Sequence, residues 1–203
     1  MVKKSLNFLI FLFIFSLYFV SFLMIYDTFR ERKLVGMESN ALDVFQNEIK
    51  NKEVDPTPTE NNSGGGGGGI SYASYTILGS IEIPKIGFSS VILKEFTYDA
   101  MNVGTIKSFG SELDERGGFV ISGHNFRGRS LFMYNVHRLV GGDKIYITDT
   151  SGRQIEYTVY EVLRYVAPDD TSSYTTYDGL HATLITCEDG GKTRIVVKAS
   201  ANN

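Results

Sequence analysis

The chain of 203 residues has little cysteine and little net charge, and both shortages restrict its function. Its single cysteine, Cys187, cannot form an intrachain disulfide or supply a zinc site made of several cysteines. With 20 basic and 23 acidic residues the formal net charge is −3, and no basic stripe is present, which argues against a nucleic-acid partner. By count alone, a lone cysteine is more often an inert, buried residue than a reactive one.

A long apolar segment lies near the N-terminus. Leu6 to Tyr26 are 21 positions without a charge, and as a helix they would span roughly 31 Å, about one bilayer core. No small-x-small cleavage site occurs between Ser21 and Asp27, which predicts an uncleaved signal anchor. Basic residues flank the segment almost equally, so the positive-inside rule decides little. We expect residues 1–4 in the cytoplasm, residues 5–26 in the membrane and the large C-terminal part outside.

Residues 27–75 are predicted to form a helical stalk and a linker. Apolar residues recur there at helical spacing among polar ones, at Leu34, Met37, Ala41, Phe45 and Ile49. A Pro/Thr-rich stretch then leads into six glycines, Gly64 to Gly69. This composition is typical of a linker that buries no core.

From Thr76 the sequence is typical of short strands separated by Gly, Asp, Ser and Pro. Seven segments are predicted as strands, at residues 77–84, 91–93, 118–122, 144–148, 155–163, 182–187 and 194–198. A short helix is predicted near residues 130–139. Strands at this spacing favour an all-β barrel or sandwich, and residues 76–203 are enough for a real core.

The last two predicted strands form a hairpin, and its turn determines which residue lies opposite Cys187. With Gly190 and Gly191 at the centre of the turn, Cys187 lies opposite Arg194. Opposed residues on one face lie roughly 4.5–5.5 Å apart at Cβ, and a guanidinium there favours a thiolate and can donate to an oxyanion. A turn centred on Asp189 and Gly190 would place Lys192 opposite Cys187 instead. Alternation also places Thr183 and Ile185 on the face of Cys187.

His124 ends the apolar run of the 118–122 strand, in the sequence Ser-Gly-His-Asn. Functional side chains gather at strand ends, and a cysteine nucleophile needs a proton donor for a leaving amine. His137 and His181 are predicted to be structural residues. The combination of Cys187, His124 and Arg194, rather than any one of them, predicts a catalytic site.

These residues resemble the sortase family. Thr183-Leu-Ile-Thr-Cys187 matches the sortase signature TLxTC, Gly123-His124 follows a strand as the sortase histidine does, and Arg194 occupies the place of the family's arginine. Gly79 with Ile81-Glu-Ile-Pro84 and the stretch from Gly142 also resemble family segments. The resemblance covers Thr76 to Ala199, essentially the whole predicted folded part.

The resemblance implies an eight-stranded β-barrel with one or two short helices, and a transpeptidase that cleaves an LPXTG-like C-terminal sorting signal. Cys187 would be the nucleophile, His124 the general acid and base, and Arg194 the clamp for substrate and oxyanion. Thr183 and Ile185 match positions that contact the sorting peptide. The implied partners are surface proteins with that signal and an amine acceptor such as a peptidoglycan precursor, at the membrane of a Gram-positive-type bacterium.

Two further expectations concern the class of sortase and its cofactors. Residues 167–181 leave no room for the long helix of class B, and no second membrane segment or pilin-type lid is evident, which favours an A-like or D-like class. No cofactor is expected. Some members bind calcium, and Asp114, Glu115, Asp169 and Asp170 are the acids that could do so, although solvated acids are the simpler interpretation.

Two other interpretations remain open at this stage. The chain could be a different cysteine peptidase that only hydrolyses, although papain-like enzymes place Cys before His and L,D-transpeptidases have Gly before the Cys, where Thr186 stands here. It could also be a membrane-tethered β-barrel that binds a partner and keeps an inert cysteine. Reaction of the thiol with a vinyl sulfone or a peptide aldehyde separates these possibilities.

Overall fold

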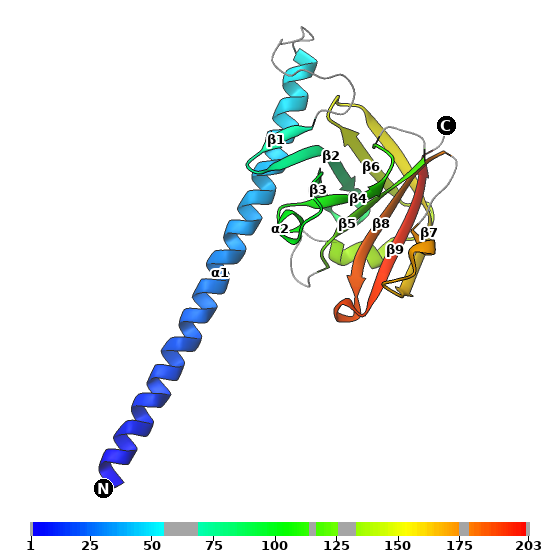
Figure 1. The fold of residues 1–203 in the computed structure, drawn as a ribbon. Coiled ribbons are helices and arrows are strands. Elements are labelled where there is room, and N and C mark those ends of the chain that lie inside the picture. Colours follow the sequence, from blue (N-terminus) through cyan, green and yellow to red (C-terminus); the bar gives the residue numbers. More distant parts are fainter. Residues whose placement is uncertain (1, 55–68, 114–116, 126–132, 175–178, 202–203) are drawn as a thin grey trace. The chain divides into compact units, whose positions relative to one another are not determined.

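A computed structural model describes residues 2–54, 69–113, 117–125, 133–174 and 179–201 (Figure 1). Most of the six-glycine run, the first part of the helix expected at 130–139, and Asp114 and Glu115 lie outside the described residues. The chain divides into two compact units, Met1–Met37 and Glu38–Asn203.

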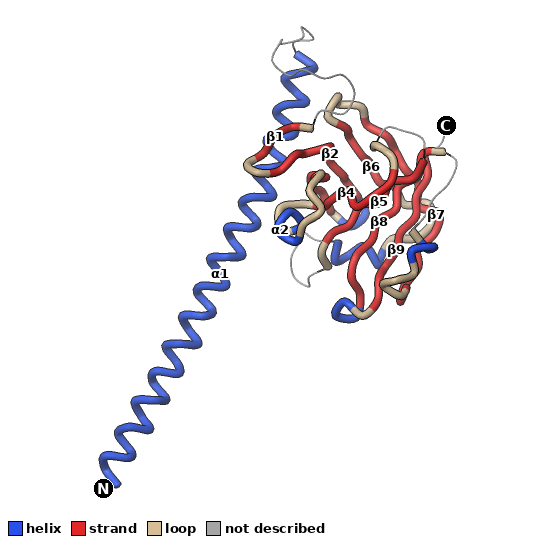
Figure 2. Tube along the Cα trace, in the orientation of Figure 1, coloured by secondary structure: helices blue, strands red, loops and turns tan. Residues whose placement is uncertain are grey.

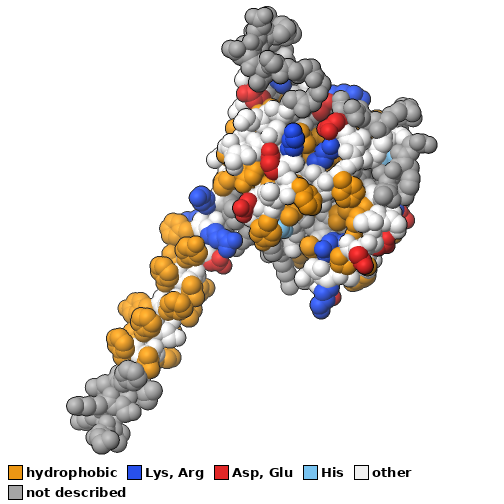
Figure 3. All heavy atoms as spheres, viewed as in Figure 1, with side chains coloured by type: hydrophobic (Ala, Val, Ile, Leu, Met, Phe, Trp, Pro, Cys, Tyr) orange, Lys and Arg blue, Asp and Glu red, His pale blue; other side chains and the backbone are white. Residues whose placement is uncertain are grey.

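The first unit is part of one long helix, α1, which spans Val2–Val54. Within it, Phe11–Arg30 is a stretch of 20 residues with a mean hydropathy of 1.8, none of it buried. Apolar side chains cover the described part of this stretch (Figure 3). A helix of this length and composition can cross a bilayer, as the apolar run in the sequence predicts.

The second unit is built from strands with short helices in the connections (Figure 2). The strands are β1 (Ile70–Tyr72), β2 (Tyr75–Ile83), β3 (Phe88–Leu93), β4 (Thr105–Gly110), β5 (Gly117–Gly123), β6 (Lys144–Asp149), β7 (Gln154–Val166), β8 (Leu180–Glu188) and β9 (Thr193–Ala201). The short helices are α2 (Tyr98–Met101) and the 3₁₀ turns η1 (Pro84–Ile86), η2 (Met133–Arg138), η3 (Thr171–Ser173) and η4 (Asp189–Gly191). The helix expected near 130–139 is therefore a 3₁₀ helix in its described part.

The strands form one sheet in the order β1-β2-β3-β4-β5-β8-β9-β7-β6, and β2 also pairs with β6. This additional pairing closes the eight strands β2 to β9 into a barrel, with β1 attached to β2. Two pairs, β3–β4 and β5–β8, are parallel, and all others are antiparallel. The eight-stranded β-barrel predicted from the sequence is confirmed.

Gly79 allows β2 and β6 to come together where the barrel closes. Gly79 pairs with Asp149, and a Cβ added to Gly79 would lie only 2.4 Å from the carbonyl oxygen of Thr148. A side chain at this position would push the two strands apart. Glycine therefore permits the close approach that closes the barrel.

Alternation along the strands gives the barrel wall two different apolar faces. The inner face forms the main core, to which β8 contributes Ala182 and Leu184 and β9 contributes Ile195 and Val197. The outer face carries a second, smaller cluster. We call it the outer cluster, and it contains Val120, Val166, Tyr174, Ile185 and Val196.

The C-terminal part of α1, from Glu38 onwards, packs within the second unit. Ala41 and Phe45 are buried, and the Lys52 ammonium donates to the carbonyl oxygen of Thr150 at 2.8 Å. Glu38 is also buried, with 2% of its surface exposed, and burial raises the pKa of its carboxyl to about 8. Neither of its carboxyl oxygens has a hydrogen-bond partner among the described residues. The nearby Ser90 hydroxyl donates to Val91 O and accepts from Thr105 N instead.

The packing of Glu38 predicts a pH-dependent stability. Because folding raises the pKa of this carboxyl from 4.5 to about 8, the folded state binds its proton more tightly than the unfolded chain does. The contribution of this carboxyl to the stability is fully present below about pH 4.5 and is lost as the pH rises to about 8. We expect Glu38→Gln to raise the free energy of unfolding at pH 8, by on the order of a few kcal/mol, and to have little effect near pH 5. Thermal unfolding of the full chain in detergent at the two pH values measures this.

Glu48→Gln is the matched control, because Glu48 is exposed on the same helix. Equal responses of the two variants to pH would contradict the prediction.

Candidate active site

The β8–β9 hairpin brings Cys187 and Arg194 together. Cys187 pairs with Arg194 across the two strands, and the next pair is Glu188 with Thr193. Gly190 and Gly191 both have positive φ angles, of 64° and 93°, and the Lys192 N–H donates to the Asp189 carbonyl. This is the two-glycine turn that the sequence favours, so the predicted register is confirmed and the alternative with Lys192 opposite Cys187 is wrong.

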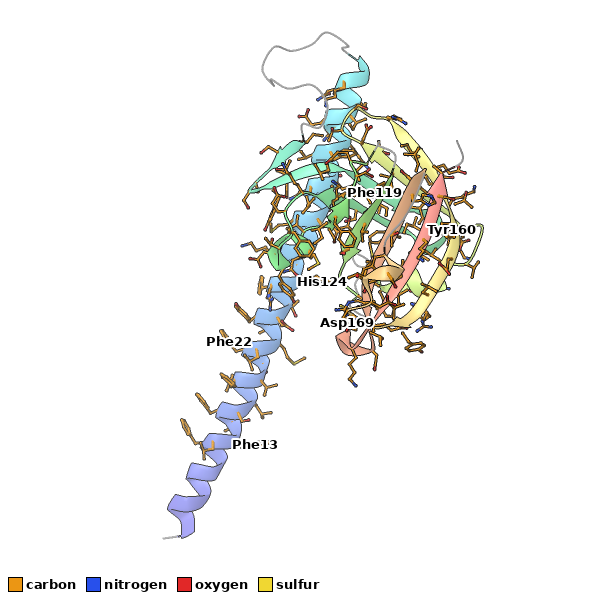
Figure 4. All side chains as sticks on the ribbon, turned by 45° about the vertical axis from the view of Figure 1, so that its right-hand side comes forward. Phe13, Phe22, Phe119, His124, Tyr160 and Asp169 are labelled. Carbon is orange, nitrogen blue, oxygen red and sulfur yellow. The ribbon has the colours of Figure 1, made fainter. Side chains whose placement is uncertain are left out.

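His124 directly follows β5, the strand on the other side of β8. In the parallel β5–β8 pair, Gly123 lies opposite Thr186, and the Thr186 hydroxyl donates to the carbonyl oxygen of Gly123 at 2.8 Å. His124 is therefore level with Cys187 on the neighbouring strand, where backbones lie about 4.8 Å apart. Figure 4 shows His124 at the end of the barrel to which the β8–β9 turn also belongs.

The three predicted catalytic residues lie on or directly after three adjacent strands, in the order β5, β8, β9, and Cys187 and Arg194 share one face. Cys187 alternates with Ile185, and Arg194 alternates with Val196, and both apolar residues belong to the outer cluster. Cys187 and Arg194 are half-buried rather than sealed in the core. The sequence prediction that a thiol, an imidazole and a guanidinium meet at one end of the barrel is thus consistent with the structure.

The Arg194 guanidinium is held by the turn that follows Cys187. Its Nη1 donates to the carbonyl oxygens of Gly191 at 2.8 Å and of Thr193 at 3.0 Å. The position of the guanidinium therefore depends on where the β8–β9 turn lies.

His124 is covered by an aromatic ring from a different part of the chain. Only 8% of its surface is exposed, and the ring of Tyr98, in α2, packs edge-on with centroids 4.8 Å apart. The His124 carbonyl accepts from the Met133 N–H at 2.9 Å. Tyr98 itself is 60% exposed. The sequence gives no signal for this contact, because 26 positions separate the two residues.

Asn125 joins the strand end of His124 to that of Cys187. Its side-chain amide donates to the carbonyl oxygen of Cys187 at 2.5 Å. Two side-chain hydrogen bonds thus link the end of β5 to β8, one from Asn125 to the Cys187 carbonyl and one from Thr186 to the Gly123 carbonyl. Asn125 was not predicted as a site residue, and its place beside His124 is the only signal for it in the sequence.

Thr183 and Ile185, the predicted peptide contacts, are both buried. Ile185 lies in the outer cluster with Tyr174, whose hydroxyl has a pKa raised by burial and partly lowered again by the Arg194 guanidinium. The Thr183 hydroxyl has no hydrogen-bond partner among the described residues. Both positions lie on the side of Cys187, and their direct contact with a peptide stays a prediction.

The other histidines lie elsewhere. His137 is in η2 and its Nδ1 contacts the carbonyl oxygen of Tyr134 at 2.8 Å. His181 is the second residue of β8, pairs with Ser200 and packs against Tyr160. Within the described part of the chain, no three His, Cys, Asp or Glu residues lie close enough to hold a metal ion. Of the four acids named for calcium, Asp169 and Asp170 are described, and Asp170 accepts from the Ser172 hydroxyl at 2.5 Å.

Comparison with known proteins decides the family. The sortase domain family matches residues 81–202, which contain His124, Cys187 and Arg194. The chain belongs to the sortase family. It is accordingly a cysteine transpeptidase that anchors surface proteins, and its apolar N-terminal helix fits a membrane-anchored enzyme.

Individual sortases resemble the chain over most of its length. Sortase A of Bacillus anthracis is 28% identical over 175 residues, 84% of this chain and 82% of that protein. The structure of a lid mutant of sortase A from Corynebacterium diphtheriae matches with a TM-score of 0.58 and 26% identity, over 64% of this chain and 73% of that one. The fold of a Clostridium perfringens sortase D5 transpeptidase matches with a TM-score of 0.58 and 23% identity, over 83% and 97% of the two chains. These likenesses do not decide the class, and the expected A-like or D-like class stays a prediction.

Proposed function

We propose that this sortase cleaves an LPXTG-like sorting signal between its threonine and glycine and passes the threonyl acyl group to an amine. Cys187 acts as the nucleophile, His124 as general acid and then base, and Arg194 as the oxyanion clamp. The observation that supports this assignment is their alignment on three adjacent strand ends, with Cys187 directly opposite Arg194 and level with His124.

The reaction proceeds in two acyl transfers. The Cys187 thiolate attacks the threonine carbonyl carbon, the C–N bond breaks, and imidazolium at His124 gives its proton to the leaving amine. The resulting thioester is attacked by an acceptor amine, which loses a proton to His124, and the C–S bond breaks to restore the thiolate. The Arg194 guanidinium donates to the oxyanion in both tetrahedral intermediates. The thioester keeps the acyl group activated, so no ATP is needed.

The barrel works outside the cytoplasm, with residues 5–26 in the membrane and residues 1–4 in the cytoplasm. The helix Phe11–Arg30 supports the membrane span. The reaction draws only on the energy kept in the acyl bond, so it can proceed in a compartment without ATP. The acceptor amine belongs to a peptidoglycan precursor on the cell wall of a Gram-positive-type bacterium. A pilin lysine or water are the competing acceptors.

The experiment uses the full chain in detergent micelles with a sorting peptide and candidate amines. Mass spectrometry of the products is expected to show the peptide cut after threonine and joined to the amine, with transfer exceeding hydrolysis. Product containing only the free acid would identify a peptidase that hydrolyses. A chain that binds the peptide without cleaving it would identify the binding module. We propose that no cofactor is required, and parallel reactions with added Ca²⁺ or with a chelator test this.

A further inference from the structure

Glu188, the residue after Cys187, is buried and holds three hydrogen bonds from another strand. Only 8% of its surface is exposed. Its Oε1 accepts from Arg164 Nε at 2.6 Å and also from Arg164 Nη2, and its Oε2 accepts from the Tyr165 N–H at 2.9 Å. A carboxylate taken out of water needs this degree of pairing.

The donors lie on β7, which is not adjacent to β8. The strand between them is β9, since the sheet order is β8-β9-β7. Arg194 on β9 pairs with Cys187 on one side and with Val166 on the other. Glu188 itself lies opposite Thr193, the residue before Arg194, so its carboxylate reaches across β9 next to Arg194 and joins the two flanking strands. We call these contacts the Glu188 clamp.

The β7 end of the clamp has an irregular backbone. The pairing of β7 with β9 shifts register between Leu163 and Val166, and Tyr165 has a left-handed φ of 58° although it is not glycine. Such a conformation persists only where the surroundings hold it, and a bulge releases an N–H from the strand ladder. Glu188 accepts that N–H, and the Arg164 guanidinium lies 5.1 Å from the centre of the Tyr165 ring. The bulge thus directs the Tyr165 N–H and the Arg164 guanidinium at the Glu188 carboxylate.

We propose that Glu188 is a positioning residue that fixes Arg194 beside Cys187 by clamping β9 between β7 and β8. The inference rests on the catalytic roles proposed above for Cys187 and Arg194. The Arg194 guanidinium is bonded to the carbonyls of Gly191 and Thr193, so it moves with the β8–β9 turn. Without the clamp, the turn and the guanidinium lose their fixed distance from the thiol.

The test compares Glu188→Gln with Glu161→Gln in the full chain. Glu161 is the matched control, because its carboxylate also links β7 to β9, through Lys198 Nζ at 2.9 Å, but is 42% exposed and lies away from Cys187. We expect Glu188→Gln to lower kcat roughly 10- to 100-fold with little change in KM. A displacement of the Arg194 guanidinium by about 1 Å from the reacting atoms can lower the rate by up to about 100-fold. Glu161→Gln is expected to stay within about twofold of the unchanged protein.

A second readout needs no peptide. The rate of Cys187 alkylation by iodoacetamide is followed against pH, because the thiolate is the reacting form. Loss of the nearby Arg194 guanidinium moves the profile of Glu188→Gln to higher pH. If Glu188 acted only through its own negative charge, its removal would move the profile to lower pH. Arg164→Gln, which breaks the same clamp from β7, is expected to move the profile in the same direction as Glu188→Gln.

The outcomes separate this inference from the proposed function. Equal kcat values for Glu188→Gln and Glu161→Gln, or an alkylation profile that shifts to lower pH, overturn the clamp. An unchanged protein that cleaves no peptide overturns the proposed function, while the alkylation profiles still test the clamp. If Glu188→Gln fails to fold by circular dichroism, Arg164→Lys keeps the positive charge, breaks the forked contact, and is expected to lower kcat in the same way.

Discussion

Replacement of Cys187 by alanine is expected to abolish both peptide cleavage and transfer to the amine. No other cysteine exists in the chain, so no thiol can form the thioester. Loss of a nucleophile that acts with a histidine lowers kcat by on the order of 10⁴-fold or more. Turnover of a fluorogenic sorting peptide by the full chain measures the effect, and mass spectrometry is expected to show an acyl-enzyme for the unchanged protein only.

The fold should survive this substitution. Cys187 is half-buried near the end of β8, and alanine removes one sulfur atom without altering the pairing with Arg194. Cys187→Ser is the companion variant, since it keeps the shape but supplies a weak nucleophile. A folded Cys187→Ala protein that still releases the cleaved peptide at the original rate would disprove the assignment.

Replacement of His124 by alanine is expected to lower kcat about 10²- to 10⁴-fold. The leaving amine then has no proton donor, and the attacking amine has no base. Arg194→Ala is expected to cause a loss of about 10²- to 10³-fold through the oxyanion. The two variants differ in one measurable respect: added imidazole can enter the space left by His124 and restore part of the rate, while it cannot replace the guanidinium.

His137→Ala and His181→Ala are the matched controls for His124. Both side chains lie away from Cys187, in η2 and at the far end of β8. They are expected to keep the kcat of the unchanged protein within about twofold. A loss in either control as large as that in His124→Ala would contradict the choice of His124.

The local pattern of the sequence predicted the strands that carry the site. The strands at 118–122, 182–187 and 194–198 appear in β5, β8 and β9, since apolar and β-branched runs bounded by glycine form strands. The two-glycine turn fixed the register of Cys187 against Arg194. Both the strands and the turn depend on residues within about ten positions of one another, and for this reason they can be predicted from the sequence.

The sequence pattern did not predict two of the strands, β1 and β4. β4 has six residues, Thr-Ile-Lys-Ser-Phe-Gly, with no apolar run, and it is stabilised by its partners β3 and β5 rather than by its own composition. β1 has three residues and begins before the predicted barrel start at residue 76. Strands this short depend on tertiary pairing, so local propensity does not reveal them.

The supporting residues of the site were also beyond sequence reasoning. Tyr98, Asn125 and Glu188 reach their partners His124, Cys187 and Arg164 across 26, 62 and 24 positions. Such contacts follow from the sheet order and from side-chain direction, and neither can be read from a local pattern. The family resemblance predicted which residues react, whereas the structure shows which residues hold them in place.

The parallel pairing of β5 with β8 has a consequence for how the enzyme matures. It joins Gly123 to Thr186, so this part of the barrel wall forms only when residues 63 positions apart come together. Contacts of such high sequence separation form late in folding, because their loop entropy is lost before they stabilise the chain. The thiol therefore acquires its imidazole neighbour only when the barrel is complete. A newly made chain whose barrel is incomplete carries a cysteine without this neighbour, and its activity begins with the final native contacts.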